Sequence, residues 1–91
     1  MYKIVARKQF LKQLKKCLQK KGNTQKAFEI VVSYLQETGT VPNEYYPHKL
    51  EGKYKGLWEC HIKPDWLLVW RINKNEIEIE LTHTGTHSDL F

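Results

Sequence analysis

The sequence has no long hydrophobic run and only two cysteines, and its first 28 residues contain no acidic residue. No segment approaches the roughly 18 apolar residues of a membrane-spanning helix, and the N-terminus lacks the apolar core of a signal peptide. We therefore expect a cytoplasmic protein without a membrane partner. Cys17 and Cys60 lie within apolar patterns rather than at framework spacings, which predicts reduced core thiols and no disulfide.

The positive charge is concentrated at the N-terminal end of the chain. Residues 1–28 carry nine Lys or Arg, whereas residues 29–91 carry six against ten Asp or Glu, so net charges of +9 and −4 sum to +5. This segment predicts an anionic partner, and nucleic acid is favoured over a membrane because no amphipathic anchor with interfacial Trp is present. A solvated helix face whose lysines only maintain solubility is the alternative. The candidate RNA-binding lysines are Lys8, Lys12, Lys15, Lys16 and Lys55.

The spacing of apolar residues predicts an α+β fold. With 41% hydrophobic residues and a length of 91, the chain fits one domain over residues 1–91. Helical spacing predicts one helix that stops at Gly22 and another that begins after Thr24 and ends at Gly39. Strands are predicted at 2–6, briefly at 48–50, and at 57–62, 66–72 and 76–81, and a polar tail is predicted for the last residues. The expected architecture is an N-terminal strand, a helical hairpin and an antiparallel β-meander.

One predicted strand places two titratable residues, Glu59 and His61, two positions apart. Side chains alternate along a strand, so Glu59 and His61 share the face opposite Cys60. The apolar face is expected to pack on the helices. We therefore expect Glu59 and His61 to be displayed outward from the sheet.

Four histidines, all in the second half of the chain, are candidates for proton transfer: His48, His61, His83 and His87. Imidazole both takes and gives a proton near neutral pH. Cleavage of RNA by its own 2′-hydroxyl needs a base, an acid and a cation near the phosphate. Several histidines, carboxylates such as Glu59 or Asp65, and a Lys or Arg supply these groups without a metal.

Two other functional sites built from these residues have weaker support in the sequence. A zinc site of Cys60, His61, His83 and His87 is disfavoured because adjacent strand residues point to opposite faces. A hydrolase triad within residues 87–89 is disfavoured because neighbouring residues rarely form a triad. Five aromatic residues are candidates for stacking on unpaired bases: Tyr45, Tyr46, Tyr54, Trp66 and Phe91. For Tyr45, Tyr46 and Trp66, packing in the protein and contact with a base stay equally open.

The segments EGKYKGLWECHIKPDWLLVW (51–70) and TGTHSDLF (84–91) resemble the YafQ-type toxins of the RelE/ParE superfamily, components of bacterial type II toxin–antitoxin systems. The resemblance spans nearly the whole chain in layout and is specific in residues 48–72 and 83–91. It implies a RelE-like fold and a ribosome-dependent mRNA endonuclease that inhibits translation without a metal or other cofactor. It also implies a cognate antitoxin partner and a toxin–antitoxin hetero-oligomer.

The resemblance also implies the site residues. The implied catalytic set is His48, Glu59, His61, Asp65 and His87, and the implied substrate-binding set is Trp66, Arg71, His83 and Phe91. Among the implied catalytic residues, we expect His87 to be the general acid and His48 or His61 the base. We expect the carboxylates of Glu59 and Asp65 to orient the imidazoles. The N-terminal lysines are expected to bind ribosomal RNA.

Two positions depart from the family pattern. Glu59 stands where members often have Asp, a mild change. His83 stands where Arg commonly precedes TGTH, which removes a permanent cation from the phosphate. Arg71, Lys55 or Lys63 is expected to compensate, with slower or more acid-favoured cleavage.

Two other functions remain open. The first is a gyrase inhibitor of the ParE branch, which shares the fold but lacks such a histidine cluster. The second is an inactive relative that only pairs with an antitoxin or binds RNA.

Overall fold

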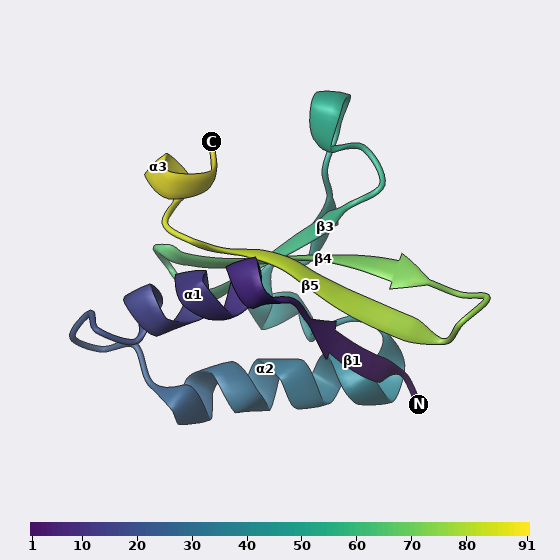
Figure 1. Ribbon diagram of the computed structural model, residues 1–91, viewed down its shortest axis with the longest axis horizontal. Helices are drawn as coiled ribbons and strands as arrows, with labels where there is room; N and C mark the ends of the chain where they lie inside the picture. Colours follow the sequence, from purple (N-terminus) through teal and green to yellow (C-terminus); the bar gives the residue numbers. More distant parts are fainter.

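Two helices cover one face of a five-stranded sheet, and a short third helix lies against its other face (Figure 1). The computed structural model describes residues 1–91. None of its helices combines the length and the apolar character that crossing a membrane requires. The elements are β1 (Lys3–Ala6), α1 (Lys8–Cys17), α2 (Gln25–Thr38), the 3₁₀ turn η1 (Asn43–Tyr45), β2 (His48–Lys49), the 3₁₀ turn η2 (Gly52–Tyr54), β3 (Trp58–Lys63), β4 (Trp66–Asn73), β5 (Glu78–Gly85) and α3 (His87–Leu90).

The start and the end of α2 follow the sequence prediction. The Thr24 hydroxyl accepts a hydrogen bond from the Ala27 amide at 3.1 Å, which satisfies a free donor at the helix start. Gly39 ends the helix in the left-handed region, with φ at 82°, a conformation that glycine adopts without steric cost.

The sheet has the strand order β1-β5-β4-β3-β2. Strands β2 to β5 form the predicted antiparallel meander, and β1 pairs in parallel with β5. The α+β prediction is confirmed. The partner of β1 was not predicted, because period-two patterns identify strands but not which strand lies beside which.

The main core lies between the sheet and the helices α1 and α2. Phe10, Leu35, Cys60, Leu68 and Trp70 are each at most 1% exposed there. The cysteines are free and buried, as predicted. Burial raises the pKa of the Cys60 thiol to about 12, so this thiol stays protonated at physiological pH.

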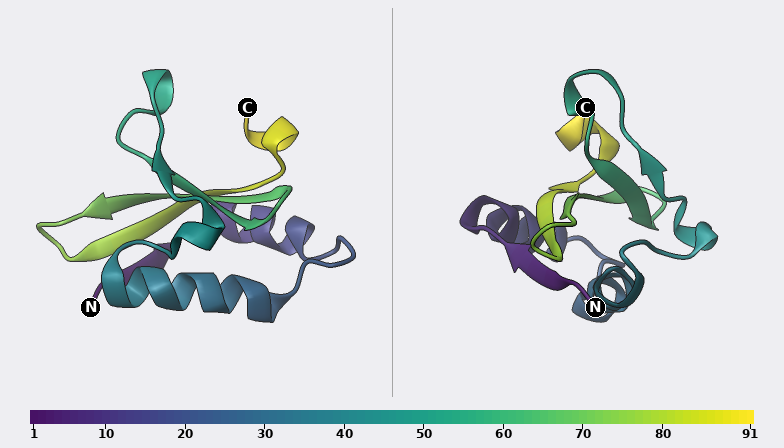
Figure 2. Two further views of the ribbon diagram at one scale, coloured as in Figure 1. Left: turned by 180° about the vertical axis from the view of Figure 1, so that it is seen from behind. Right: turned by 90° about the vertical axis from the view of Figure 1, so that its right-hand side faces the viewer.

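The opposite face of the sheet is also covered, which the sequence did not predict. Figures 1 and 2 show α3 and the η2 segment on the side of the sheet away from α1 and α2. Leu67 and Val69, which point to this side, are 1% and 2% exposed. The outward display predicted for Glu59 is therefore wrong, because this side chain shares their face and the residue is only 5% exposed.

The C-terminal residues are ordered into elements and do not form a simple polar tail. β5 continues to Gly85, and α3 follows at once. The Thr86 hydroxyl accepts from the Asp89 amide at 3.1 Å while the Asp89 carboxylate accepts from the Thr86 amide at 3.0 Å, a capping box. Gly85 allows close approach, since a Cβ there would lie 3.1 Å from the Asp89 side chain.

Candidate functional site

The sheet register places three titratable side chains in one row. His48 lies opposite Glu59, Glu59 opposite Val69, and Val69 opposite His83. His48 Nε2 and Glu59 Oε1 are 3.1 Å apart, whereas Glu59 Oε2 is buried without a hydrogen-bond partner. A buried carboxylate oxygen without a partner is costly, which marks Glu59 as a candidate functional residue.

Both ring nitrogens of His48 are engaged. Nδ1 lies 3.1 Å from the carbonyl oxygen of Tyr46, and a carbonyl only accepts, so Nδ1 carries a proton. Nε2 faces the Glu59 carboxylate, which also accepts when it is ionised. A ring held in this way has no nitrogen left for contact with a substrate.

His61 is held differently. Its Nδ1 lies 3.2 Å from the Pro64 carbonyl oxygen and therefore donates, which leaves Nε2 with a free lone pair. The ring packs edge-on against Tyr46, with centroids 5.9 Å apart. It borders an open groove of about 650 Å³ that Lys63 also lines.

The C-terminal segment brings His87 and Phe91 to the same side of the sheet. The His87 amide lies 3.5 Å from Asp65 Oδ1, at the turn between β3 and β4. The Phe91 ring packs against the His87 ring, with centroids 5.4 Å apart, and edge-on against Tyr54 at 5.0 Å. The Tyr54 hydroxyl donates to the Leu90 carbonyl at 3.4 Å. These contacts tie α3 to η2.

His83 lies beneath this C-terminal segment. It lines a cavity of about 220 Å³ together with Tyr54, Val69, Leu90 and Phe91. Tyr54 is a candidate for base stacking by its aromatic ring but is not among the site residues that the resemblance implies. Its contacts are with residues 36 and 37 positions away, which no local pattern in the sequence indicates.

Two predicted substrate-binding residues lie elsewhere. Trp66 is 1% exposed, packs in the helix-side core, and donates from Nε1 to the Thr84 hydroxyl at 2.9 Å, so it cannot stack on a base. Trp66, Leu68 and Trp70 are two positions apart along β4 and so share one face of the strand, a spacing that already indicates a core position for Trp66. Arg71 is held by Glu80 at 2.6 Å toward the β4–β5 hairpin, and the structure does not bring it to the histidines.

The predicted basic residues are exposed. Lys8, Lys12 and Lys15 lie on the solvent side of α1, Lys16 borders a cavity beside this helix, and Lys55 follows η2. Lys55 borders a separate groove with Trp58, so Lys63 is the lysine that shares a groove with a candidate catalytic histidine.

The structure also bears on the zinc alternative. Cys60 is fully buried in the helix-side core, whereas His61 is on the other face. No group of three or more His, Cys, Asp or Glu side chains is arranged to hold a metal ion.

Comparison with known proteins identifies the family of the chain. The sequence profile of the family described as "Bacterial toxin of type II toxin-antitoxin system, YafQ" matches residues 2–91. The chain belongs to the YafQ toxin family.

Among its relatives, the mRNA interferase toxin YafQ of Escherichia coli strain K12 is 29% identical over 83 residues, which are 91% of this chain and 88% of the relative. The crystal structure of a metal-bound toxin from Helicobacter pylori is 41% identical, covers 100% of both chains, and superposes with a TM-score of 0.87. YafQ in the E. coli DinJ–YafQ complex is 27% identical, covers 100% of this chain and 99% of the other, and superposes with a TM-score of 0.82.

These findings confirm the predicted YafQ family and the RelE-like fold. The predicted class of activity agrees with the relatives, which are mRNA interferase toxins by name. The metal named for the H. pylori toxin has no matching ligand cluster among the side chains of this YafQ-family chain.

Proposed function

We propose that this YafQ-family chain is an mRNA interferase that cleaves mRNA on the ribosome by metal-independent attack of the 2′-hydroxyl. The proposal is supported by the location of the His48–Glu59 pair, His61 and the His87–Phe91 segment on the same face of the sheet, away from α1 and α2 (Figure 1). Imidazoles from β2, β3 and α3 share this face, although they lie far apart in the sequence.

In this mechanism a base removes the proton of the 2′-hydroxyl, and the 2′-oxygen then bonds to phosphorus. The bond from phosphorus to the 5′-oxygen breaks, and an acid gives that oxygen a proton. The products are a 2′,3′-cyclic phosphate and a 5′-hydroxyl. Each proton transfer by a positioned side chain contributes about 10²- to 10⁴-fold in rate.

The contacts support His61 as the base and His87 as the acid. His61 Nε2 is free to accept a proton because Nδ1 is committed to the Pro64 carbonyl. His48 has both nitrogens engaged, so its role is that of a cation beside the phosphate, stabilised by Glu59. Together with Lys63, it replaces the charge that the family Arg supplies at position 83.

The remaining predicted contacts follow from charge and family. The exposed lysines of α1 are proposed to bind ribosomal RNA, and Phe91 to position the nucleotide. A cognate antitoxin is proposed as the partner that inhibits the toxin, as the complex of E. coli YafQ with DinJ suggests.

The first test is the His87→Ala variant, with Ser88→Ala on the same exposed helix as the matched control. We expect His87→Ala to abolish growth arrest while its thermal unfolding matches the wild type, and Ser88→Ala to arrest growth normally. Full toxicity of a folded His87→Ala variant would reject the acid assignment.

Mapping of transcript 5′ ends separates this function from gyrase inhibition. Expression of the wild type should create new 5′ ends within translated codons. A DNA-damage response without such ends would favour the ParE-like activity, and neither response would favour an inactive relative.

A further inference from the structure

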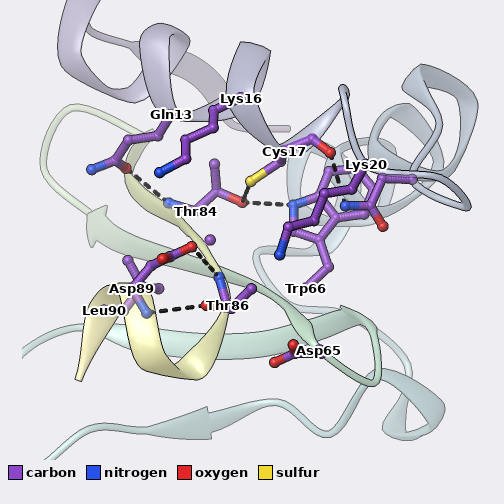
Figure 3. Close-up of a pocket in the computed structure, with 12 residues that line it drawn as sticks. Gln13, Lys16, Cys17, Lys20, Asp65, Trp66, Thr84, Thr86, Asp89 and Leu90 are labelled. Atoms are coloured by element: carbon purple, nitrogen blue, oxygen red, sulfur yellow. Dashed lines mark hydrogen bonds between the residues drawn. The ribbon is translucent and has the colours of Figure 1, made fainter.

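A second cavity lies beside the candidate site, between α1 and α3 (Figure 3). Its volume is about 250 Å³, and its walls come from α1 and the turn after it, the β3–β4 turn, the end of β5, and α3. It contains none of the four histidines. None of the groups proposed above to transfer a proton lines it, although Asp65 and Trp66, which the resemblance implies as site residues, do.

Two cations, Lys16 and Lys20, border the cavity without a direct ion pair. Figure 3 shows the side chains of Lys16 and Lys20 extending from the α1 side into the space that faces α3. Neither lysine takes part in any of the ion pairs of the structure. Besides the hydrogen bonds from Thr86, both ammonium groups are near enough to Asp89 to lower its pKa, but neither is in contact with a carboxylate, so both can bind an anionic group such as a phosphate.

The side of the cavity that faces the lysines is acidic, so a ligand that carries only negative charge, such as a free phosphate ion, does not fit it. Asp65 and Asp89 both line the cavity. Hydrogen bonds from the Thr86 amide and hydroxyl hold the pKa of Asp89 below its usual range. A nucleotide fits this mixed lining, because its phosphate pairs with ammonium groups while its base donates N–H bonds to a carboxylate.

The size of the cavity limits the ligand to a single nucleotide. Pockets for drug-sized ligands are about 300–1,000 Å³, so a cavity of about 250 Å³ is suited to one nucleotide and not to a longer segment. Gln13 and Asn23 add amide groups to the lining, each with one side-chain atom committed to the protein backbone.

The position of the cavity connects it to the proposed reaction centre. Asp65 lines the cavity and also lies within hydrogen-bond distance of the His87 amide. The preceding residue, Pro64, lines the groove that contains His61. The groove and the cavity therefore lie on the two sides of the β3–β4 turn, beside the proposed acid and base.

We propose that this cavity binds the nucleotide adjacent to the scissile phosphodiester, with Lys16 and Lys20 on its phosphate and Asp65 on its base. The inference rests on the proposed function and adds a substrate subsite to it. Such a subsite makes cleavage depend on the identity of a neighbouring base, since a carboxylate only accepts hydrogen bonds and finds an exocyclic amino group on adenine, cytosine and guanine but not on uracil.

The test uses a short RNA with 2′-O-methyl groups, which binds but lacks the attacking hydroxyl. Its affinity is measured by NMR titration for the wild type, for K16Q/K20Q, and for K3Q/K26Q, a control that removes the same charge from exposed lysines that line no cavity. We expect K16Q/K20Q to weaken binding at least tenfold more than the control, and the wild-type amide signals of Gln13 and Gly85 to shift. Equal losses in both double variants, or no shift at these amides, would overturn the subsite.

Cleavage on ribosomes distinguishes failure of the subsite from failure of the proposed function. If His87→Ala is inactive while K16Q/K20Q cleaves with unchanged KM and unchanged sequence preference, the subsite is wrong and the catalytic proposal stands. If the wild type cleaves no RNA at all, the catalytic proposal fails, and the assignment to a scissile nucleotide fails with it.

Discussion

At the scale of single residues, Glu59 is the side chain whose environment is hardest to explain by stability. One carboxylate oxygen pairs with His48, and the other is buried without a partner. Replacement of buried ionic groups by apolar residues of similar volume is often neutral or stabilising. A buried, half-satisfied carboxylate on the face that carries the histidines is consistent with a position kept for function.

The Glu59→Leu variant tests this explanation. We expect its free energy of unfolding in urea to equal or exceed that of the wild type, by up to about 2 kcal/mol, because the half-exposed His48 is hydrated when it loses its partner. Toxicity should be lost. A Glu59→Gln variant controls for side-chain volume, and a destabilisation of more than about 2 kcal/mol by Glu59→Leu would make the residue structural.

His61 and His48 differ in which ring nitrogen is free, and this difference predicts different losses of activity. His61→Ala removes the proposed base and should lower the single-turnover cleavage rate by about 10²- to 10⁴-fold. His48→Ala removes a proposed cation and should cost less. The base assignment fails if His48→Ala proves the more damaging of the two.

At the scale of elements, the end of α2 depends on close contact with the N-terminus. Gly39 has φ at +82°, and a Cβ there would lie 2.9 Å from the Tyr2 ring. Gly22 also has positive φ, at +92°, but nothing lies within 4 Å of its Cβ position. The two glycines therefore separate backbone strain from steric overlap.

Alanine at each glycine gives the corresponding prediction. Gly22→Ala should cost about 1–2 kcal/mol from left-handed backbone strain alone, and Gly39→Ala should cost clearly more because Tyr2 must also move. Chemical denaturation of both variants measures the difference. Equal costs would show that the Tyr2 contact adds nothing.

Glu80 on β5 contacts Arg71 on β4 and Arg7, the residue before α1, and these contacts make the stability of the fold depend on pH. Hydrogen bonds from Arg71 and then Arg7 hold the pKa of Glu80 below its usual range. Because the folded-state pKa is the lower one, this stabilisation is complete above the unfolded-state pKa and is lost as pH falls through the folded-state value.

The Glu80→Gln variant should therefore lose stability relative to the wild type at pH 7, and the difference in unfolding free energy should shrink below about pH 4. The neighbouring Glu78→Gln variant controls for the removal of one acidic charge from the same strand. A difference that stays constant from pH 7 to pH 3 would contradict the role given to the two arginines.

At the scale of the whole molecule, the features that could be predicted from the sequence are those set by residues close to one another along the chain. The caps at Thr24 and Gly39, the strands of the meander and the burial of Cys60 follow from propensity and period. Period two places Glu59 on a face but does not say what covers that face. The cover comes from η2 and α3, short segments whose contacts, such as Tyr54 with Phe91, join distant parts of the chain.

The expectation of one domain over residues 1–91 stays a prediction, and a single cooperative unfolding transition is its test. The same nonlocal contacts that cover the sheet also assemble the site. The histidines identified in the sequence gained their separate roles only when the partners of each ring nitrogen were known.

The central claim is that histidines, without a metal, transfer the protons in RNA cleavage. The most direct measurement is the chemistry of the cut ends when purified toxin, stripped of bound metal with EDTA and then freed of the EDTA, acts on ribosome-bound mRNA in the Mg²⁺ that ribosomes require. We expect cleavage equal to that of unstripped toxin, with 5′-hydroxyl ends and 2′,3′-cyclic phosphate ends. Cleavage that is lost on stripping and restored only by a transition metal, or that leaves 5′-phosphate ends, would show that histidines alone do not carry the reaction.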